Sequence, residues 1–279
     1  MWRDMIADPL TERIACDEIP DMVCSYDRYI ASGLYDRRYP RPNRRTLGML
    51  LHHLPADGRF LDFGAGTGRY AEPLLQLTDA SGVAYDICPT AGRIMSERLD
   101  GFVKDGRLMI RDDSPASLSE EFRSAFDLVF LAFGVLAHVS GRANRQNMLS
   151  ILRQTLQPDG VLIAGLPNRA RRFRAERRAA QSRVVDGELE EGDVLYRRGR
   201  NADTIPMFYH LFTPEEARRE FEAAGFHVEH IQAESVWAEE TVVSSAFVSW
   251  LDNVVCRSLP AAYGFGFLVV ARSRMTEGL

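Results

Sequence analysis

Cysteine is scarce in this sequence. The 279 residues include only four cysteines, and no two of them form a C-x-x-C pair. Because zinc sites and disulfide frameworks need cysteines at close, regular spacings, we expect neither a structural metal nor disulfide bonds. This usage fits a reducing compartment, and we expect the protein to be cytoplasmic. The four residues are Cys16, Cys24, Cys88 and Cys256.

Long hydrophobic runs are also missing. The longest apolar stretch, Phe126–Val139, is interrupted by Asp127 and His138, and it falls short of the roughly 20 residues that a membrane span needs. Acidic residues occur early in the chain, at Asp4 and Asp8, where a secretory signal would carry a basic segment before an apolar one. We therefore expect neither a membrane partner nor a secretory signal.

A large excess of charge of one sign is absent as well. The 34 basic and 39 acidic residues give a formal net charge of −5. Tight, non-specific binding of nucleic acid depends on a basic excess, so the composition argues against it without excluding a local basic patch. The length, with 46% hydrophobic and 26% charged residues, suits one large α/β domain with an elaborated cap.

From residue 59 onward, short apolar runs alternate with helical patterns. This alternation predicts a Rossmann-like α/β fold, with a parallel sheet and helices on both faces. Ligands of such sheets bind beyond the carboxyl ends of the strands. The predicted strands are residues 59–63, 82–86, 108–111, 126–132, 161–166, 226–231 and 266–271. The main predicted helices are residues 44–54, 70–77, 90–99, 142–156, 213–225 and 242–259, with a turn at 157–160.

Two segments lie outside this alternation. Residues 1–55 are expected to form an N-terminal helical cap or lid on the main domain, residues 56–279. After the fifth strand, residues 168–212 form a predicted insertion on the substrate side. Six arginines lie within residues 168–178 and five acids within 186–193, which favours a solvated helix followed by a hairpin.

The most informative segment is Phe60–Tyr70, where an apolar strand runs into a glycine-rich turn and then a helix. Gly64, Gly66 and Gly68 allow a sharp turn and close approach of a ligand, and the helix start presents free N–H groups. The turn also matches the dinucleotide-binding pattern G-x-G-x-x-A. However, Asp62 at the end of the strand would repel a pyrophosphate, whereas it could hold an ammonium group.

Acidic residues also follow the next two strands. Asp86 ends the second strand, 22 positions after Gly64, where a carboxylate can accept both hydroxyls of a ribose. Asp112 and Asp113 follow the third strand, and we favour Asp112 as an acceptor for the amino group of an adenine. The structural alternative for Asp86 is an ordinary acid at the end of a strand, and the alternative for Asp112 and Asp113 is a solvated turn.

These features resemble the class I S-adenosylmethionine-dependent methyltransferases, in particular the group that includes the ubiquinone-biosynthesis enzymes. The similar stretch covers about 110 residues, and its motifs are specific as an ordered set. One departure is Asp159, where that group usually has glycine. The motifs are Leu61–Gly68, Val83–Asp86, Phe126–Val129, Leu136–Val139 and Leu156–Ile163.

The resemblance implies a seven-stranded sheet whose last strand, near Phe267–Ala271, is antiparallel. It implies S-adenosylmethionine as cofactor and S-adenosylhomocysteine as product. It places the methionine end of the cofactor at Asp62–Gly68, the ribose at Asp86 and the adenine near Asp112. The expected cofactor-binding residues are Tyr35, Asp62, Gly64, Ala65, Gly66, Gly68, Asp86, Ile87, Asp112, Asp113, Ala132 and Phe133.

Methyl transfer from a sulfonium needs mainly an acceptor held in line, and a general base only when the acceptor carries a proton of high pKa. His138, after the fourth strand, is the first catalytic candidate, and Tyr209 and His210 at the end of the insertion are the second. Packing roles are the alternatives for all three. The tyrosines of the N-terminal segment could close over the cofactor as a lid, with a ring against the sulfonium, and core packing is the alternative. They are Tyr26, Tyr29, Tyr35 and Tyr39, of which we favour Tyr35.

The leading hypothesis is an enzyme that methylates O, N or C of a small molecule. A second resemblance, carried by Gly192–Leu195 and Phe208–Thr213, is to enzymes that methylate carboxymethylated wobble uridines in tRNA. In those enzymes an arginine and two aromatic residues precede the histidine, whereas this chain has Met207, Phe208 and Tyr209. A non-catalytic binding module is a third alternative. No acidic and histidine cluster with metal-ligand spacing is apparent, and the sequence does not indicate an oligomeric state.

Overall fold

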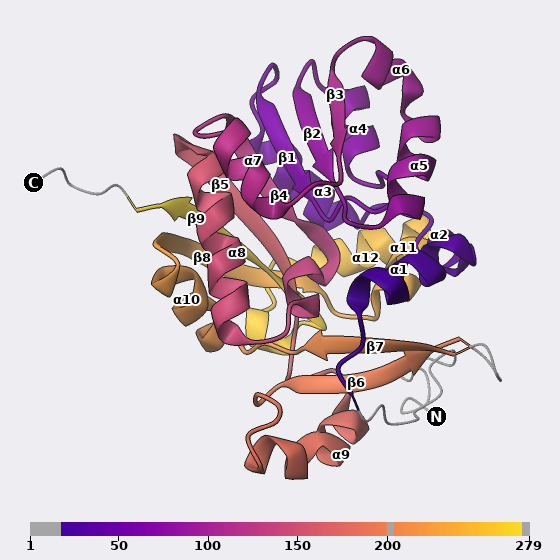
Figure 1. Ribbon diagram of the computed structural model, residues 1–279, viewed down its shortest axis with the longest axis vertical. Coiled ribbons are helices and arrows are strands. Elements are labelled where there is room, and N and C mark those ends of the chain that lie inside the picture. Colours follow the sequence, from indigo (N-terminus) through magenta and orange to yellow (C-terminus); the bar gives the residue numbers. More distant parts are fainter. Residues whose placement is uncertain (1–17, 200–203, 275–279) are drawn as a thin grey trace, which may run out of the picture.

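The computed structural model describes residues 18–199 and 204–274. Asp4, Asp8 and Cys16, and the first part of the expected cap, lie outside the described residues. The described chain is built on a seven-stranded sheet with the order β3-β2-β1-β4-β5-β9-β8 (Figure 1). Its strands are β1 (Arg59–Phe63), β2 (Ser81–Tyr85), β3 (Leu108–Arg111), β4 (Phe126–Leu131), β5 (Leu156–Pro167), β8 (Phe226–Ser235) and β9 (Gly266–Ser273).

The direction of the strands confirms the predicted fold class. β1 to β5 pair in parallel, whereas β9 runs antiparallel to both of its neighbours, β5 and β8. The strand order reverses beside β1, so the carboxyl ends of β1, β2 and β4 meet at one edge where ligands of such sheets bind.

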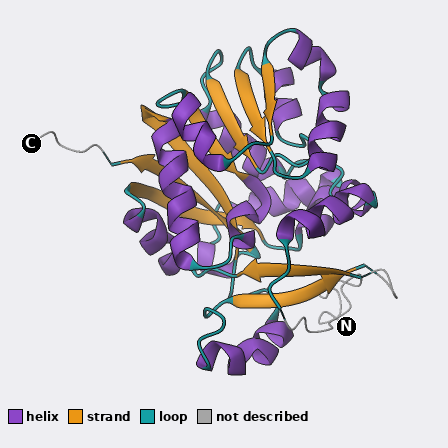
Figure 2. Ribbon diagram, in the orientation of Figure 1, coloured by secondary structure: helices purple, strands orange, loops and turns teal. Residues whose placement is uncertain are grey.

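Helices cover both faces of the sheet (Figure 2). The helices on one face include α7 (Pro115–Glu121), α8 (Arg142–Thr155) and α10 (Pro214–Ala223), and those on the other include α3 (Arg44–His53) and α4 (Ala71–Leu77). The remaining helices along this part of the chain are α5 (Pro89–Arg98), α6 (Asp100–Lys104), the short helix η2 (Ala132–His138), α11 (Glu239–Ser244), α12 (Ala246–Cys256) and η3 (Ala261–Tyr263).

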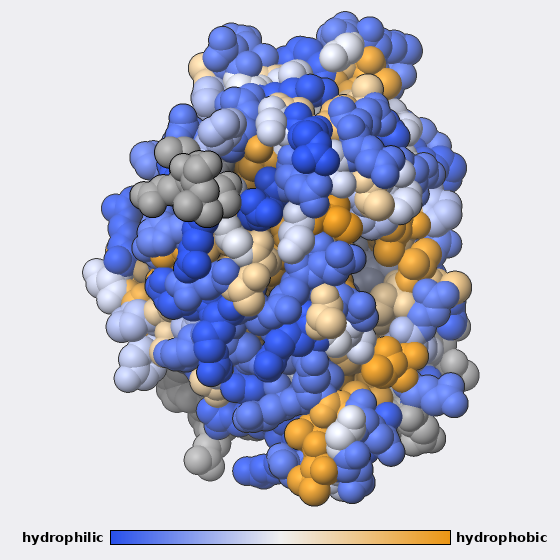
Figure 3. Space-filling model, turned by 60° about the vertical axis from the view of Figure 1, so that its left-hand side comes forward, coloured by the Kyte–Doolittle hydropathy of each residue, from blue (hydrophilic) through white to orange (hydrophobic). Residues whose placement is uncertain are grey.

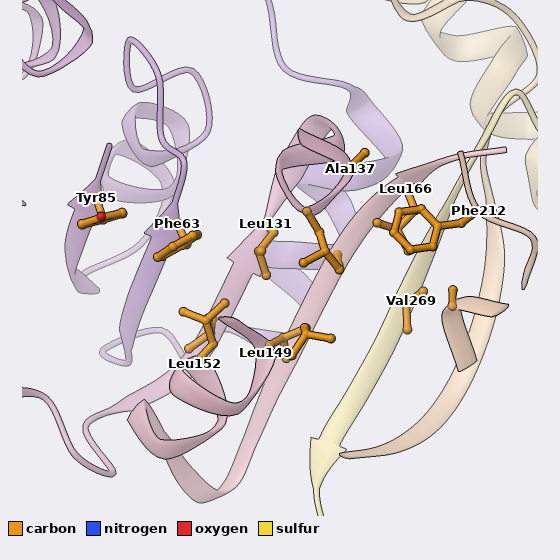
Figure 4. Close-up of a cluster of buried hydrophobic side chains, with 14 of the residues drawn as sticks. Phe63, Tyr85, Leu131, Ala137, Leu149, Leu152, Leu166, Phe212 and Val269 are labelled. Atoms are coloured by element: carbon orange, nitrogen blue, oxygen red, sulfur yellow. The ribbon is translucent and has the colours of Figure 1, made fainter. Parts of the chain in front are cut away.

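Two hydrophobic cores hold these layers together, because alternate strand residues face opposite sides. In β1, Leu61 and Phe63 belong to one core, and Phe60 to the other. Figure 4 shows Leu149 and Leu152 of α8 over the sheet, in the same core as Phe63. Each such fully buried side chain contributes roughly 1.5–3 kcal/mol, so the sheet edge that carries the loops is rigidly supported.

Residues 168–212, which we call the arm, project from the end of β5 (Figure 1). The arm contains α9 (Arg174–Val185) and a two-stranded antiparallel sheet of β6 (Asp193–Arg198) and β7 (Ile205–His210). Asn168 and Phe212 form a β-bridge, so the arm leaves and returns at one place. Residues 200–203, between β6 and β7, lie outside the described residues.

The N-terminal helices lie between the sheet and the arm. α1 (Met22–Ala31) contacts α5 on one side and β7 on the other, and α2 (Leu34–Arg38) follows it (Figure 1). α1 begins where the Asp21 carboxylate accepts the backbone N–H of Val23 at 2.9 Å, a normal helix N-cap.

Two local expectations are wrong. The single helix predicted over residues 242–259 is divided into α11 and α12 by Ser245, which has extended φ/ψ angles and accepts the Val248 N–H with its side chain. Serine competes with helix geometry by such local bonds. The predicted turn at 157–160 is instead part of β5, with a shift of register against β4.

The surface is mixed in character. The face in Figure 3 is largely hydrophilic, with hydrophobic patches that include one at the lower end, where α9 lies in Figure 1. Val185 at the end of α9 is 77% exposed. None of the described helices is long and apolar enough to cross a membrane.

Candidate functional site

The glycine-rich turn lies at the carboxyl end of β1. The N–H groups of Gly64 and Ala65 donate to the carbonyl oxygen of Tyr85 at 2.8 and 2.9 Å, which ties the turn to the end of β2. Gly64 and Gly66 have φ angles of +81° and +56°, which side chains rarely permit. A Cβ at Gly64 would lie 2.5 Å from Val135 Cγ2, so both conformation and space require glycine there.

Asp86 connects the two loops that follow β1 and β2. It is 8% exposed, and its carboxylate accepts the N–H of Gly66 at 2.7 Å and that of Cys88 at 2.9 Å. Burial raises the pKa of this carboxyl. Because a carboxylate offers about four acceptor positions, Asp86 can still accept further hydrogen bonds from a ligand.

Asp62 is buried beneath the same turn. It is 2% exposed, and its Oδ2 has no hydrogen-bond partner among the described residues. Burial, reinforced by the nearby Asp86, raises the pKa of Asp62 well above its usual value. An unpaired buried carboxylate oxygen is costly, so a donor or cation brought close to Asp62 would be favourable.

A cavity of about 180 Å³ lies beside this turn. It brings together eight of the fifteen predicted site residues, from the cap and from the segments that follow β1, β2 and β4. The eight are Tyr35, Gly64, Gly66, Asp86, Ile87, Ala132, Phe133 and His138. The other lining residues are Met22, Tyr26, Ile30, Phe63, Tyr85, Cys88, Pro115, Val135, Val139 and Met148.

Several predicted residues do not line this cavity. Asp62, Ala65 and Gly68 lie within or beneath the turn. Asp113 forms an ion pair with Arg111 at 2.9 Å, and Asp112 is exposed. Neither acid lines the cavity. The lining residue nearest to them in the sequence is Pro115.

The chain makes an unusual turn as it leaves β4. Phe133 and Gly134 have consecutive positive φ angles of +63° and +78°. Phenylalanine rarely adopts this conformation, and such strain is maintained only by surrounding contacts. Here the Phe133 ring packs 4.4 Å from the ring of Tyr39, and the turn directs Phe133 into the cavity wall.

His138 is held on both sides by hydrogen bonds. Its Nε2 lies 2.6 Å from the hydroxyl of Tyr26, and its Nδ1 lies 2.9 Å from the carbonyl oxygen of Phe208. A carbonyl can only accept, so Nδ1 carries the proton and Nε2 accepts from Tyr26. Burial lowers the pKa of His138 to about 3, so the ring is neutral near pH 7.

Tyr209 and His210 point to different places, as neighbours in a strand do. The Tyr209 ring lies 4.6 Å from that of His138, directly behind the cavity wall. Burial raises the pKa of Tyr209 to about 12. His210 instead lies in a fully buried ion network, with Nδ1 2.6 Å from Asp193 and Nε2 3.4 Å from Glu216.

This network contains two groups of three potential metal ligands that the spacing in the sequence did not reveal. The groups are Glu190, Asp193 and His210, and His210, Glu216 and Glu220. Arg145 contacts Glu190 at 2.7 Å and Glu220 at 2.6 Å. The arginine therefore already supplies the positive charge that these carboxylates need, and we interpret the cluster as a structural ion network.

The sequence pointed to Tyr26, as one of the N-terminal tyrosines, but missed the contribution of Met22 and Ile30 to the cavity. Met22, Tyr26 and Ile30 line it, and their spacing of four residues places them on one helix face. That spacing was the available signal, but in a single helix it equally indicates ordinary core packing.

The sheet order, the antiparallel β9 and the glycine turn beside Asp86 define a class I methyltransferase fold. A protein family described as "Methyltransferase domain" matches residues 61–162, the stretch that runs from the glycine turn into β5. Residues 61–162 therefore match a methyltransferase domain in sequence, and the described chain has the fold of the class I S-adenosylmethionine-dependent methyltransferases. No curated protein sequence matches the chain.

Solved structures support the fold over most of the chain. The CcbJ methyltransferase from Streptomyces caelestis is 17% identical, with a TM-score of 0.59 over 84% of this chain and 90% of that one. The Burkholderia thailandensis 1,6-didemethyltoxoflavin-N1-methyltransferase, solved with 1,6-didemethyltoxoflavin and S-adenosylhomocysteine, is also 17% identical, with a TM-score of 0.59 over 95% of this chain and 96% of that one.

The fold similarity also extends beyond methyltransferases. The cyclase SpnF is 14% identical, with a TM-score of 0.59 over 94% of this chain and 98% of that one. The fold alone therefore does not specify the reaction, and the argument for a function depends on the residues of the site.

Proposed function

We propose that the protein transfers a methyl group from S-adenosylmethionine to a small-molecule acceptor. The observation that carries this proposal is the unpaired, buried oxygen of Asp62 beneath a glycine turn that Asp86 holds in place. An anionic cofactor would be repelled by two acids, whereas a cofactor with an ammonium group and a ribose fits both. The residues present therefore fit S-adenosylmethionine.

In this proposal the residues of the glycine turn and those of the cavity wall have separate roles. Asp62 attracts the ammonium group, and Asp86 accepts the ribose hydroxyls while it keeps Gly66 in place. Ile87, Cys88 and Pro115 give an apolar surface to the adenine. The cofactor, when bound, supplies a methyl group on a sulfonium, which is already activated for displacement.

The acceptor side of the cavity is formed by Tyr26, Phe133 and His138. The low pKa of His138 and its bond from Tyr26 make it a poor proton acceptor as the ring stands. It acts in this proposal as a positioning residue, which holds the Tyr26 hydroxyl with a lone pair facing the acceptor. Holding the acceptor in line can by itself lower the barrier by several kcal/mol.

The structure gives the RNA alternative less support. Two arginines of the basic stretch donate to the protein's own backbone, Arg169 to Glu191 O at 2.9 Å and Arg171 to Tyr263 O at 2.7 Å. Arg172 packs over the ring of Tyr209. These side chains therefore contact the arm and the main domain, and they are less available to bind the phosphates of an RNA.

The direct test follows a labelled methyl group. The protein is incubated with S-adenosylmethionine, labelled on the methyl, and a cell extract, which is then separated into RNA and small molecules. We expect label among the small molecules, in a product that can be identified by its mass. Label in RNA alone would support the tRNA alternative, and no transfer despite cofactor binding would support a binding module.

The Asp86→Ala variant tests the cofactor site. Losing hydrogen bonds to a charged group costs about 1.5–3 kcal/mol each, so the Kd for S-adenosylhomocysteine should rise at least ~10-fold. The measurement is isothermal titration calorimetry. Asp113→Ala, which changes an acid outside the cavity, is the matched control. Unchanged affinity in Asp86→Ala would contradict the cofactor assignment.

A further inference from the structure

Among the residues that the structure describes, a buried arginine without a carboxylate partner lies close to the aromatic rings that line the cavity. Arg198, at the end of β6, is 6% exposed. Its Nη1 donates to the hydroxyl of Tyr39 at 3.3 Å and its Nε to that of Tyr196 at 3.4 Å. Within residues 18–199 and 204–274, no acidic side chain forms an ion pair with it. Phenols are weak substitutes for a carboxylate, so this charge is buried at a high cost.

Two further guanidinium groups face the same region. Arg69 is 4% exposed, and its Nε and Nη2 have no hydrogen-bond partner. Its guanidinium carbon lies 4.6 Å from the centre of the Phe133 ring. Arg172 lies 5.1 Å from the centre of the Tyr209 ring, and its Nε is likewise buried without a partner. We call Arg69, Arg172 and Arg198 the arginine cluster.

Aromatic rings connect this cluster to the cavity. Phe133 and Tyr35 line the cavity, and the ring of Tyr39 lies 4.4 Å from the first and 5.5 Å from the second. Arg198 packs 5.4 Å over the ring of Tyr29, whose buried hydroxyl has no partner. The arginine cluster therefore lies directly behind the wall that faces the acceptor, among edge-to-face aromatic rings.

Two buried acids near the arginine cluster offset only part of its positive charge. Glu239 lies 3.7 Å from Arg69, and Glu234 accepts the Thr46 hydroxyl at 2.6 Å. Burial raises the pKa of both carboxyls, that of Glu234 to about 8. Neither acid pairs with Arg198, so among the described residues the three guanidinium groups of the cluster outnumber the two buried acids beside them.

We propose that the methyl acceptor is a small aromatic molecule that carries an oxyanion, a carboxylate or a phosphate monoester, and that Arg198 binds this oxyanion. A planar guanidinium matches both groups with paired hydrogen bonds. The rings of Tyr35 and Phe133, which line the cavity, then pack against the ring of the acceptor. This inference rests on the proposed function, because it places the acceptor beside the cofactor.

The test compares matched probes on the full-length protein with S-adenosylhomocysteine. The probes are 2-hydroxybenzoate, 4-hydroxybenzoate and phenyl phosphate, with 2-hydroxybenzamide as the neutral analogue and acetate and inorganic phosphate as ions without a ring. We expect a hydroxybenzoate or phenyl phosphate to bind at least ~10-fold more tightly than the amide and the simple ions, which is about 1.4 kcal/mol. Whichever binds more tightly, the carboxylate or the phosphate monoester, identifies the oxyanion of the acceptor.

The variant Arg198→Gln should lose this preference, with the affinity for S-adenosylhomocysteine unchanged. Arg197→Gln is the matched control, because Arg197 is the adjacent residue of β6, donates to Thr204, and faces the opposite side. Should Arg198→Gln fail to fold, the comparison of acid with amide in the unmodified protein still decides. If every aromatic oxyanion binds no better than its amide or acetate, the inference is wrong. If the unmodified protein does not bind S-adenosylhomocysteine, that result counts against the proposed function instead.

Discussion

His138 shows how one residue links three distant segments. The ring contacts Tyr26 of α1 and Phe208 of β7 while it belongs to the segment after β4. These contacts require a neutral ring with the proton on Nδ1. Its environment therefore opposes protonation, and this has a consequence for stability.

Below pH 6.5 an unfolded His138 takes up a proton, whereas the folded protein resists protonation until the pKa of about 3. The free energy of unfolding should therefore fall as the pH falls from 6.5, by up to about 1.4 kcal/mol for each pH unit. In His138→Gln this decline should be shallower between pH 6.5 and 4.5, as measured by urea unfolding. The control is His227→Gln, at an exposed position; equal pH dependence in both variants would disprove the assignment.

At the scale of elements, α2 is fastened to the glycine turn. The Thr67 hydroxyl donates to the Asp36 carboxylate at 2.8 Å, and Tyr35 of the same helix lies against Gly66. α2 therefore forms part of the cavity wall and is attached at the point where the cofactor would bind.

Removing this attachment should weaken cofactor binding without unfolding the protein. In Asp36→Ala the lost hydrogen bond, about 0.5–1.5 kcal/mol, should raise the Kd for S-adenosylhomocysteine roughly 2- to 10-fold. Calorimetry measures the change. Arg37→Ala, on the same helix but with a side chain that donates to the carbonyl of Ser32 and not to the glycine turn, should bind normally. If Asp36→Ala also binds normally, α2 does not act as a lid.

The elements themselves could be predicted from the sequence where local pattern decides them. Strands 59–63 and 108–111 have the predicted bounds, because apolar runs with clear turn signals specify strands locally. The glycine turn and Asp86 were likewise recognisable, since their spacing is fixed within one βαβ unit. Met22 and Arg198 were not recognisable, because their importance arises from contacts between α1, β6 and the sheet that no local pattern records.

At the scale of the whole molecule, a buried ion network attaches the arm to the main domain. Arg145 of α8 joins Glu220 of α10 to Glu190 of the arm, and His210 joins Asp193 to Glu216. Hydrogen bonds to the carboxylates raise the pKa of His210 against the opposing effect of its burial. The stability that these hydrogen bonds contribute is present below pH 6.5, and it is lost as the pH rises through the raised pKa of His210.

Arg145→Met tests this attachment. Removing one member of a buried ion pair leaves its partners uncompensated, which costs about 3–5 kcal/mol. Chemical denaturation should show a loss of this size, and Arg145→Met with Glu220→Gln should recover part of it. A loss below about 1 kcal/mol, comparable with an exposed pair, would contradict the view that the network holds the arm.

The position of β9 also sets the order in which the sheet can be completed. Among the described strands β8 pairs with β9 alone, and β9 is inserted between β8 and β5 although it comes later in the chain. During synthesis, β8 and one edge of β5 are thus made before the strand that joins them. Until β9 emerges, both present unpaired backbone groups that can pair with other chains. We therefore expect the nascent protein to depend on chaperones at this stage, even though the finished sheet buries the same edges.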